Sequence, residues 1–219
     1  MNRRGSLSRN TRLLAPKTRV QDRRAATARP TAGYRARGIA GMQQHEAFCA
    51  PEVWHEPDGR SEIRYVLEPA GAGYYHPVTV DELRERIAQL PAHLTRMLEV
   101  VQLSRITRKR IIFPCYGMQW GSTVYLYPIE EALIEHYVRP PGPQQLIEAK
   151  MYGGRWCQEG EQWRLEWTKE TIRDYYLNNI LIHEIGHIND ERNSTFADRE
   201  RYADWFAIEY GYRPSRGRK

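Results

Sequence analysis

Residues 181–190 read LIHEIGHIND and place His183 and His187 four positions apart, with Glu184 directly after the first histidine. Positions i and i+4 lie one turn apart on the same helical face, so both imidazoles can reach one Zn²⁺ at about 2.0 to 2.1 Å. Glu184 is rotated by about 100° from His183, so it would address a metal-activated water molecule and not the metal itself. The motif therefore predicts a hydrolytic zinc site.

The residues before the motif predict a buried central helix. Thr168 is placed to cap this helix, and apolar side chains then follow on most of its sides as far as Ile188. Gly186 is small enough to let another element approach the helix closely. Buried histidine and glutamate side chains need partners, because each unsatisfied polar group costs roughly 1 to 3 kcal/mol.

The sequence also limits the choice of a third metal ligand. No histidine follows His187, so the remaining donors are carboxylates. Residues 198–212, DRERYADWFAIEYGY, predict a second helix that ends at Gly211 and carries Glu200 and Asp204 on one face. The polar residues before it predict a reversing loop, which would bring one of these two carboxylates toward the histidines.

HEIGH at 183–187 and ERYAD at 200–204 together resemble the gluzincin zinc metallopeptidases, the thermolysin-like group. The longer stretch ERYADWFA is similar to small intracellular members of that group, including the repressor-cleaving ImmA/IrrE-type proteins. The resemblance covers residues 168–211 and implies a zincin-like fold. It further implies metal ligands at His183, His187 and Glu200, a general base at Glu184, and a residue that orients a ligand histidine at Asp204.

The reach of the two carboxylates favours the same assignment. Glu200 has the longer side chain and lies nearer the loop, whereas Asp204 is placed to hydrogen-bond His183. If this assignment is wrong, Asp198 or Glu191 is the alternative ligand. Asn189 departs from the family pattern, which usually has an apolar residue there. The candidates for a donor to the transition state are Tyr202, Tyr210, Tyr212 and Arg213.

The rest of the pattern predicts a small α+β domain. We expect a zincin-like fold, in which a small, mostly antiparallel sheet packs on a backing helix and the active-site helix, followed by a C-terminal helix that carries the third ligand. Pro91 is expected to kink or split the backing helix. The predicted strands cover 61–69, 122–128 and a hairpin within 155–168, and the predicted helices before the motif cover 80–101 and 130–138.

The net charge of +6 comes from one end of the chain. Residues 1–40 hold eleven basic side chains and one acidic one, a net +10, which leaves 22 basic and 26 acidic side chains, a net −4, in the remainder. We expect residues 1–40 to be a disordered basic tail that contacts nucleic acid or an anionic surface weakly, or a targeting segment. The expected domain covers 41–212, and 213–219 form a basic C-terminal tail.

The composition excludes some classes of protein. No apolar run reaches the roughly 18 residues of a membrane span, so we expect no membrane span and a cytoplasmic location. Cys49, Cys115 and Cys157 are too few and too widely spaced for a disulfide framework or a cysteine-based zinc knuckle.

Three functions remain open for the motif. The first is a zinc metallopeptidase that cleaves a peptide or protein substrate, with Glu184 as the general base and an extended substrate paired to an exposed strand, either 122–128 or the hairpin at Trp163. The second is a non-catalytic, zinc-stabilised binding module that associates with nucleic acid through the Arg-rich tail. The third is a zinc hydrolase of non-peptide substrates. Two buried histidines and two carboxylates can also form a polar network without metal.

Overall fold

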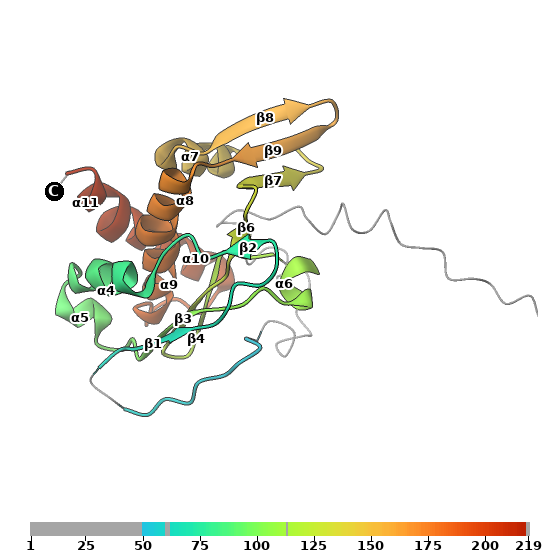
Figure 1. Ribbon diagram of the computed structural model, residues 1–219. Helices are drawn as coiled ribbons and strands as arrows, with labels where there is room; N and C mark the ends of the chain where they lie inside the picture. Colours follow the sequence, from blue (N-terminus) through green and yellow to red (C-terminus); the bar gives the residue numbers. More distant parts are fainter. Residues whose placement is uncertain (1–49, 60–61, 113, 218–219) are drawn as a thin grey trace, which may run out of the picture.

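The computed structural model describes residues 50–59, 62–112 and 114–217, so the predicted basic tail at 1–40 lies outside the described residues. The fold is mixed α+β, with small sheets (Figure 1). The strands are β1 (Arg64–Leu67), β2 (Tyr74–Tyr75), β3 (Val100–Leu103), β4 (Gly117–Trp120), β5 (Thr123–Leu126), β6 (Ile129–Glu130), β7 (Ile134–Tyr137), β8 (Arg155–Glu159) and β9 (Gln162–Glu166). The helices are α4 (Val80–Ala88), α5 (Ala92–Thr95), α6 (Arg108–Ile112), α7 (Pro143–Tyr152), α8 (Lys169–Tyr175), η2 (Tyr176–Ile180), α9 (Leu181–Ile188), α10 (Phe196–Ala207), η3 (Ile208–Tyr212) and α11 (Arg213–Ser215).

The largest sheet has four strands in the order β1-β3-β5-β4. The pairs β1·β3 and β3·β5 are parallel, and only β4 runs antiparallel to its neighbour. The prediction of a mostly antiparallel sheet is therefore wrong for this sheet. After β1 the chain crosses over through α4 and α5, so β3 begins at the same end of the sheet as β1 and runs parallel to it. Among the described strands, antiparallel pairing dominates in the two smaller sheets, β2-β6 and β7-β9-β8.

The core lies between the four-stranded sheet and the helices. Val101 and Leu103 of β3 and Val124 and Leu126 of β5 point to one face, where they join the buried side chains of α4, η2 and α9. The strand residues between them point to the other face, which the segment 50–59 covers. Its His55 stacks on the ring of Tyr125 and contacts the amide of Gln102.

The predicted backing helix is present, but it is shorter than expected. Thr79 and Glu82 form the capping box that starts α4, and Leu83 and Ile87 are buried. Pro91 splits the helical segment, as predicted, and α5 follows it. The predicted helical end at Val101 is wrong, because Val101 pairs with Tyr65 and Val124 in the middle of the sheet.

The predicted helix over 130–138 is also wrong. Leu133 adopts a left-handed conformation with φ 57°, which turns the chain, and β7 then pairs antiparallel with β9. In β7, Glu135 is buried and His136 is exposed, as strand alternation requires. The hydroxyl groups of Tyr116 and Tyr137 donate to the Glu135 carboxylate, so its burial is compensated. His136 is therefore a surface residue.

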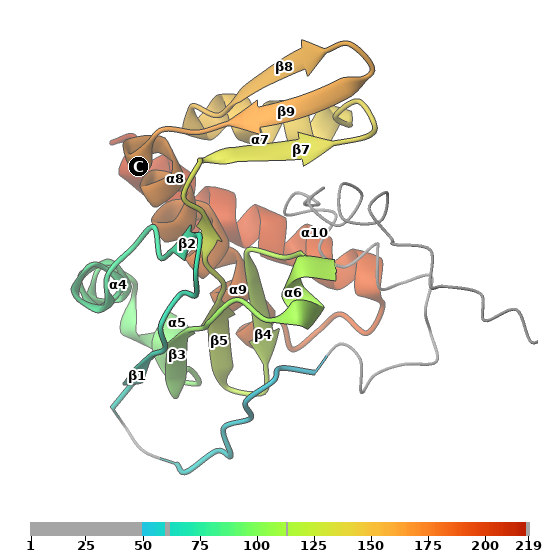
Figure 2. The ribbon, with the colours of Figure 1, turned by 45° about the vertical axis from the view of Figure 1, so that its right-hand side comes forward.

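The predicted aromatic hairpin over 155–168 is confirmed as β8 and β9, with Gly160 at its turn. β7 adds a third strand, and α7 packs beside the resulting sheet (Figure 2). Trp156 and Trp163 are half-buried, and Trp167 is buried against the ring of Tyr175. The tryptophans therefore join this sheet to the start of α8.

Two long helical segments complete the fold. Thr168 caps the first, as predicted, and α8, η2 and α9 run without interruption to Ile188. After the loop at 189–195, α10, η3 and α11 continue to Ser215, so the predicted helix end at Gly211 is wrong. A Cβ on Gly211 would lie 2.0 Å from the carbonyl oxygen of Asn178, so this glycine allows η3 to pack against η2.

In the described ranges no helix combines the length and the apolar character that a membrane crossing needs. Within the described residues, Cys115 and Cys157 are not joined in a disulfide bond. Cys49 lies outside the described residues.

Candidate metal centre

The segment α8-η2-α9 carries the HEIGH motif through the middle of the molecule (Figure 1). His183 and Glu184 are 2% and 3% exposed, and the apolar side chains of Ile182 and Ile185 beside them are fully buried. A π-helical stretch, η2, comes immediately before α9 and packs against η3. Such stretches are frequent at functional sites, where they shift the faces that side chains occupy.

Three side chains converge beside α9. His183, His187 and Glu200 each offer a ligand atom, and these atoms lie within 4.8 Å of one another. Nε2 of His187 lies 3.1 Å from one carboxylate oxygen of Glu200, and Nε2 of His183 lies 3.7 Å from the other. The two imidazole rings meet edge to face. The structure therefore brings together the three residues that the sequence predicts as ligands.

Glu200 reaches the two histidines because its helix, α10, crosses α9 at very short range. A Cβ on Gly186 would lie 3.0 Å from Cβ of Phe206 and 3.1 Å from Cα of Ala203, so a larger residue would push the two helices apart. The expectation that Gly186 admits a neighbouring element is confirmed. The side chain of Asn189, the departure from the family pattern, donates to the carbonyl oxygens of Leu94 and Ile185 and fixes the end of α9.

Asp204 lies behind His183. One of its carboxylate oxygens is 3.1 Å from Nδ1 of His183, and the other accepts a hydrogen bond of 2.8 Å from the amide nitrogen of Gln144. A carboxylate at Nδ1 favours a proton on that nitrogen, so Nε2, which faces Glu200, would be the nitrogen that binds a metal. Asp204 therefore lies within contact distance of Nδ1 of His183, on the side of the imidazole where the sequence predicts it.

The electrostatics of the cluster suit a cation. Burial of Glu200 raises the pKa of its carboxyl group, but the adjacent imidazoles of His183 and His187 outweigh this effect and hold the pKa well below its usual range. One carboxylate oxygen of Glu200 is buried without a hydrogen-bond partner among the described residues. Its 3.7 Å separation from His183 is too long for a hydrogen bond. Two imidazole nitrogens and a carboxylate with an unsatisfied oxygen fit a divalent metal ion.

Glu184 lies against the edge of the four-stranded sheet. A Cβ on Gly117, the first residue of β4, would lie 3.0 Å from both Cγ and Oε1 of Glu184 and 2.8 Å from the Ile180 side chain. Only glycine leaves room for the carboxylate here. The sequence prediction missed Gly117, although a glycine at the start of an alternating stretch, GMQW, is a recognisable signal for close approach.

The edge strand beside Glu184 is β4, not the predicted 122–128 strand. Because β5 pairs on both sides, with β3 and with β4, it has no free edge for another strand. In the four-stranded sheet the free edges belong to β1 and β4. Any extended chain that pairs with the sheet beside Glu184 would therefore use β4. The candidate at 122–128 is therefore wrong. In the other candidate, the hairpin at Trp163, β9 also pairs on both sides and only β8 has a free edge.

The other predicted candidates take part in different contacts. Asp198 bonds to Thr195 at the start of α10 and forms an ion pair with Arg201, and Glu191 is exposed. Tyr202 and Tyr210 pack on Phe206. Tyr212 packs on Tyr152, and Arg213 forms an ion pair with Glu209. None of these contacts brings them to the three converging side chains.

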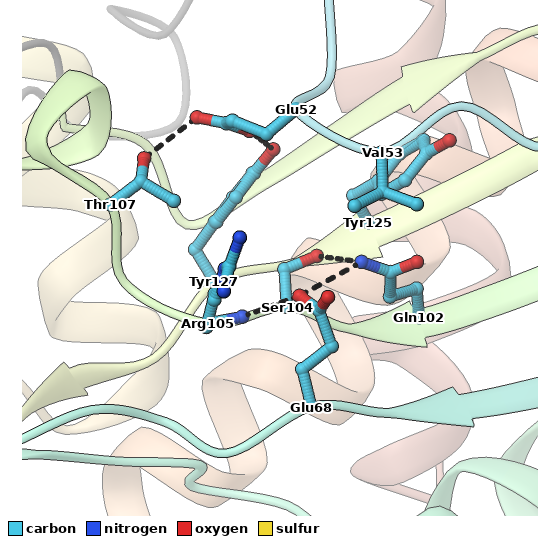
Figure 3. A pocket seen from close by; sticks show the side chains of 9 residues that line it. All are labelled: Glu52, Val53, Glu68, Gln102, Ser104, Arg105, Thr107, Tyr125 and Tyr127. Atoms are coloured by element: carbon cyan, nitrogen blue, oxygen red, sulfur yellow. Dashed lines mark hydrogen bonds between the residues drawn. The ribbon is translucent and has the colours of Figure 1, made fainter.

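A small pocket lies elsewhere, between the segment 50–59 and the sheet (Figure 3). Its polar groups bond to one another: Gln102 donates to Ser104 and Glu68, and Thr107 donates to Glu52. The bond from Thr107, together with one from the hydroxyl of Tyr127, attaches Glu52 and hence the segment 50–59 to this side of the molecule. The pocket lies on the face of the sheet away from α9 and is separate from the metal centre.

Comparisons of the chain with protein-family models, with curated proteins and with solved structures found no match. The assignment of the site therefore rests on the residues and geometry of this chain.

Proposed function

We propose that the chain is a zinc-dependent metallopeptidase of the gluzincin type with a zincin-like fold, and that it hydrolyses peptide bonds. The observation that carries this proposal is the convergence of His183, His187 and Glu200 beside a separate buried carboxylate, Glu184. Two imidazoles and one glutamate are the ligand set of catalytic zinc sites, which keep a fourth position open. A structural zinc site is normally closed by four protein ligands.

The three ligands would hold the zinc ion through Nε2 of His183, Nε2 of His187 and the carboxylate of Glu200. When bound, zinc supplies Lewis-acid chemistry, since it lowers the pKa of a coordinated water molecule to about 7 and favours negative charge on a carbonyl oxygen. Asp204, 3.1 Å from Nδ1 of His183, would favour the tautomer of that imidazole whose Nε2 can bind a metal.

Glu184 is the general base in this proposal. Its carboxylate takes a proton from the water molecule that attacks the scissile carbonyl carbon, and it then transfers that proton to the leaving amine. Gly117, which has no side chain, leaves room for this carboxylate against β4. The free edge of β4 would pair with the backbone of an extended peptide substrate, which places the scissile bond near Glu184.

The test combines metal analysis with cleavage of an unbiased peptide library. Purified wild-type protein should contain about one zinc ion per chain, and Glu184→Gln should keep the zinc but lose cleavage, because the amide cannot accept the proton. Glu161→Gln, at the exposed turn of the β8-β9 hairpin, is the matched control and should behave as wild type. Unchanged cleavage by Glu184→Gln would exclude Glu184 as the base.

The same experiment separates the alternatives. A zinc-stabilised binding module would contain zinc and cleave no peptide, in either the wild type or the variant. A hydrolase of non-peptide substrates would also leave the peptide library uncleaved, but Glu184→Gln would abolish its activity on model esters and amides. A polar network without metal would show no stoichiometric zinc. Contact of residues 1–40 with nucleic acid stays a separate prediction, tested by the salt dependence of binding.

A further inference from the structure

Gln144 joins the metal centre from outside the two helices that carry the motif. It lies in the first turn of α7, and its amide nitrogen donates a hydrogen bond of 2.8 Å to Asp204. The same nitrogen lies 3.4 Å from a carboxylate oxygen of Glu148, one turn further along α7. Both neighbours only accept hydrogen bonds, so the NH₂ end of the amide must face them.

We propose that Gln144 is a positioning residue: its amide fixes the Asp204 carboxylate, which in turn fixes the imidazole of His183 for metal binding. The inference rests on the proposed metal centre. The side chain of Asp204 is short and 27% exposed. If the contact with His183 were its only restraint, the other carboxylate oxygen could rotate toward water. The bond from Gln144 restrains that second oxygen and therefore the direction of the first.

A neutral donor suits this position better than a charged one. A lysine or arginine would compete with His183 for the negative charge of Asp204, which would weaken the interaction at Nδ1. The amide donates without adding charge, so Asp204 remains a strong acceptor for the imidazole proton. The first turn of a helix also favours a nearby carboxylate through the helix dipole.

The bond also links the metal centre to the three-stranded sheet. α7 is held to β8, where the indole nitrogen of Trp156 lies 3.4 Å from the carbonyl oxygen of Gln145. Gln144 is thus attached to the body formed by α7, β8 and β9, whereas His183 and Asp204 belong to α9 and α10. Displacement of α7 by a partner or substrate would change the restraint on Asp204.

The first test measures zinc affinity by competition with a chelator. Gln144→Met removes the donor but keeps the length of the side chain, and it should weaken zinc binding roughly 3- to 10-fold, less than loss of a direct partner of a ligand. Gln144→Glu should weaken it further, because a third carboxylate would face Asp204 and Glu148. Gln162→Met, an exposed glutamine on β9, is the matched control and should leave affinity unchanged.

A double-mutant cycle separates positioning from a general structural effect. In an Asp204→Ala background, Gln144→Met should cause no further loss of zinc affinity, because the residue through which it acts is absent. Full additivity of the two substitutions, or wild-type affinity in Gln144→Met, would overturn the proposal.

The second test needs no zinc, so it distinguishes this inference from the proposed function. Long-range ¹H–¹⁵N correlation spectra of the metal-free protein report which nitrogen of His183 carries the proton. The wild type and Gln162→Met should show a single species protonated at Nδ1, and Gln144→Met should show exchange between tautomers. An identical His183 spectrum in all three proteins would refute the role of Gln144, even if the wild type binds no zinc.

Discussion

Glu200 and Asp204 stand one helical turn apart, about 6 Å along the axis, and face different sides of the imidazole of His183. Glu200 approaches Nε2 of both histidines, whereas Asp204 approaches Nδ1 of one. We therefore predict unequal effects on zinc. Glu200→Ala should abolish stoichiometric zinc, and Asp204→Asn should weaken affinity roughly 10- to 100-fold and leave a site that excess zinc can fill.

Chelator competition on the two purified variants checks this prediction, with Glu161→Ala at the exposed turn between β8 and β9 as the control. Equal and complete loss in both variants would mean that Asp204 is itself a ligand. A normal site in Glu200→Ala would instead remove Glu200 from the metal centre, and the alternatives from the sequence, Asp198 and Glu191, would then be tested in the same way.

Gly117 acts on the position of Glu184 and not on the metal ligands. In Gly117→Ala the new methyl group would collide with the Glu184 carboxylate and with Ile180. We expect normal zinc content and a fall in peptide cleavage of about 100-fold, the cost of a displacement of roughly 1 Å at a catalytic group. Steady-state kinetics beside Gln119→Ala, a control on the same strand, measure the effect. Wild-type turnover in Gly117→Ala would show that Glu184 tolerates another position.

At the scale of elements, local patterns predicted the helices and the hairpin that carry their own signals. Thr168 and the apolar run to Ile188 define the helix that carries the HEIGH motif, and Gly160 defines the turn between β8 and β9. The errors at 130–138 and at Val101 have a common cause. Both segments become strands only because distant residues pair with them, and helix-like spacing of apolar residues cannot report that pairing.

The π-helical segments show a second limit of sequence patterns. η2 and η3 meet where Gly211 lies against the carbonyl oxygen of Asn178, which also accepts a hydrogen bond from Tyr152. On the other side, the buried guanidinium of Arg86 donates to the side chain of Asn178 and to the carbonyl oxygen of Tyr210. The sequence marked Gly211 only as a helix end, since these contacts arise from the packing of three separate segments.

Because of this packing, substitution of Gly211 and substitution of Gly186 should lower the free energy of unfolding by different amounts. Gly211→Ala would place a methyl group 2.0 Å from a backbone oxygen, whereas Gly186→Ala meets Phe206 and Ala203 at 3.0 to 3.1 Å. We expect Gly211→Ala to lower the free energy of unfolding by about 3 kcal/mol or more, and Gly186→Ala by about 1 to 2 kcal/mol. Urea unfolding of both variants measures the difference. Equal losses, or a smaller loss at Gly211, would contradict the close packing of η2 and η3.

At the scale of the whole molecule, the site depends on segments that are far apart in the sequence. The histidines, Glu200, Gln144 and Gly117 come from α9, α10, α7 and β4. The motif and its spacing predicted which three side chains would converge, because two adjacent helices hold them. Gly117 and Gln144 could not be found in this way, since their places beside Glu184 and Asp204 follow from sheet order and from the packing of α7.

Zinc should therefore stabilise the entire fold, since its ligands join α9 to α10. At a free zinc concentration 100 times the dissociation constant, binding adds about 2.7 kcal/mol to the free energy of unfolding. For a chain of this size that corresponds to a rise in Tm of roughly 5 to 10 °C. Thermal unfolding after chelation, and again after zinc is restored, measures the shift.

Glu200→Ala supplies the control for that measurement, because it lacks a ligand but keeps α9 and α10. Its Tm should not respond to zinc or to the chelator, whereas Glu184→Gln, which keeps all three ligands, should respond as the wild type does. Nonspecific binding of zinc to exposed side chains would shift all three proteins alike. An unchanged Tm in the wild type would show that the two histidines and Glu200 form a polar network that needs no metal, and it would remove the basis of the proposed peptidase.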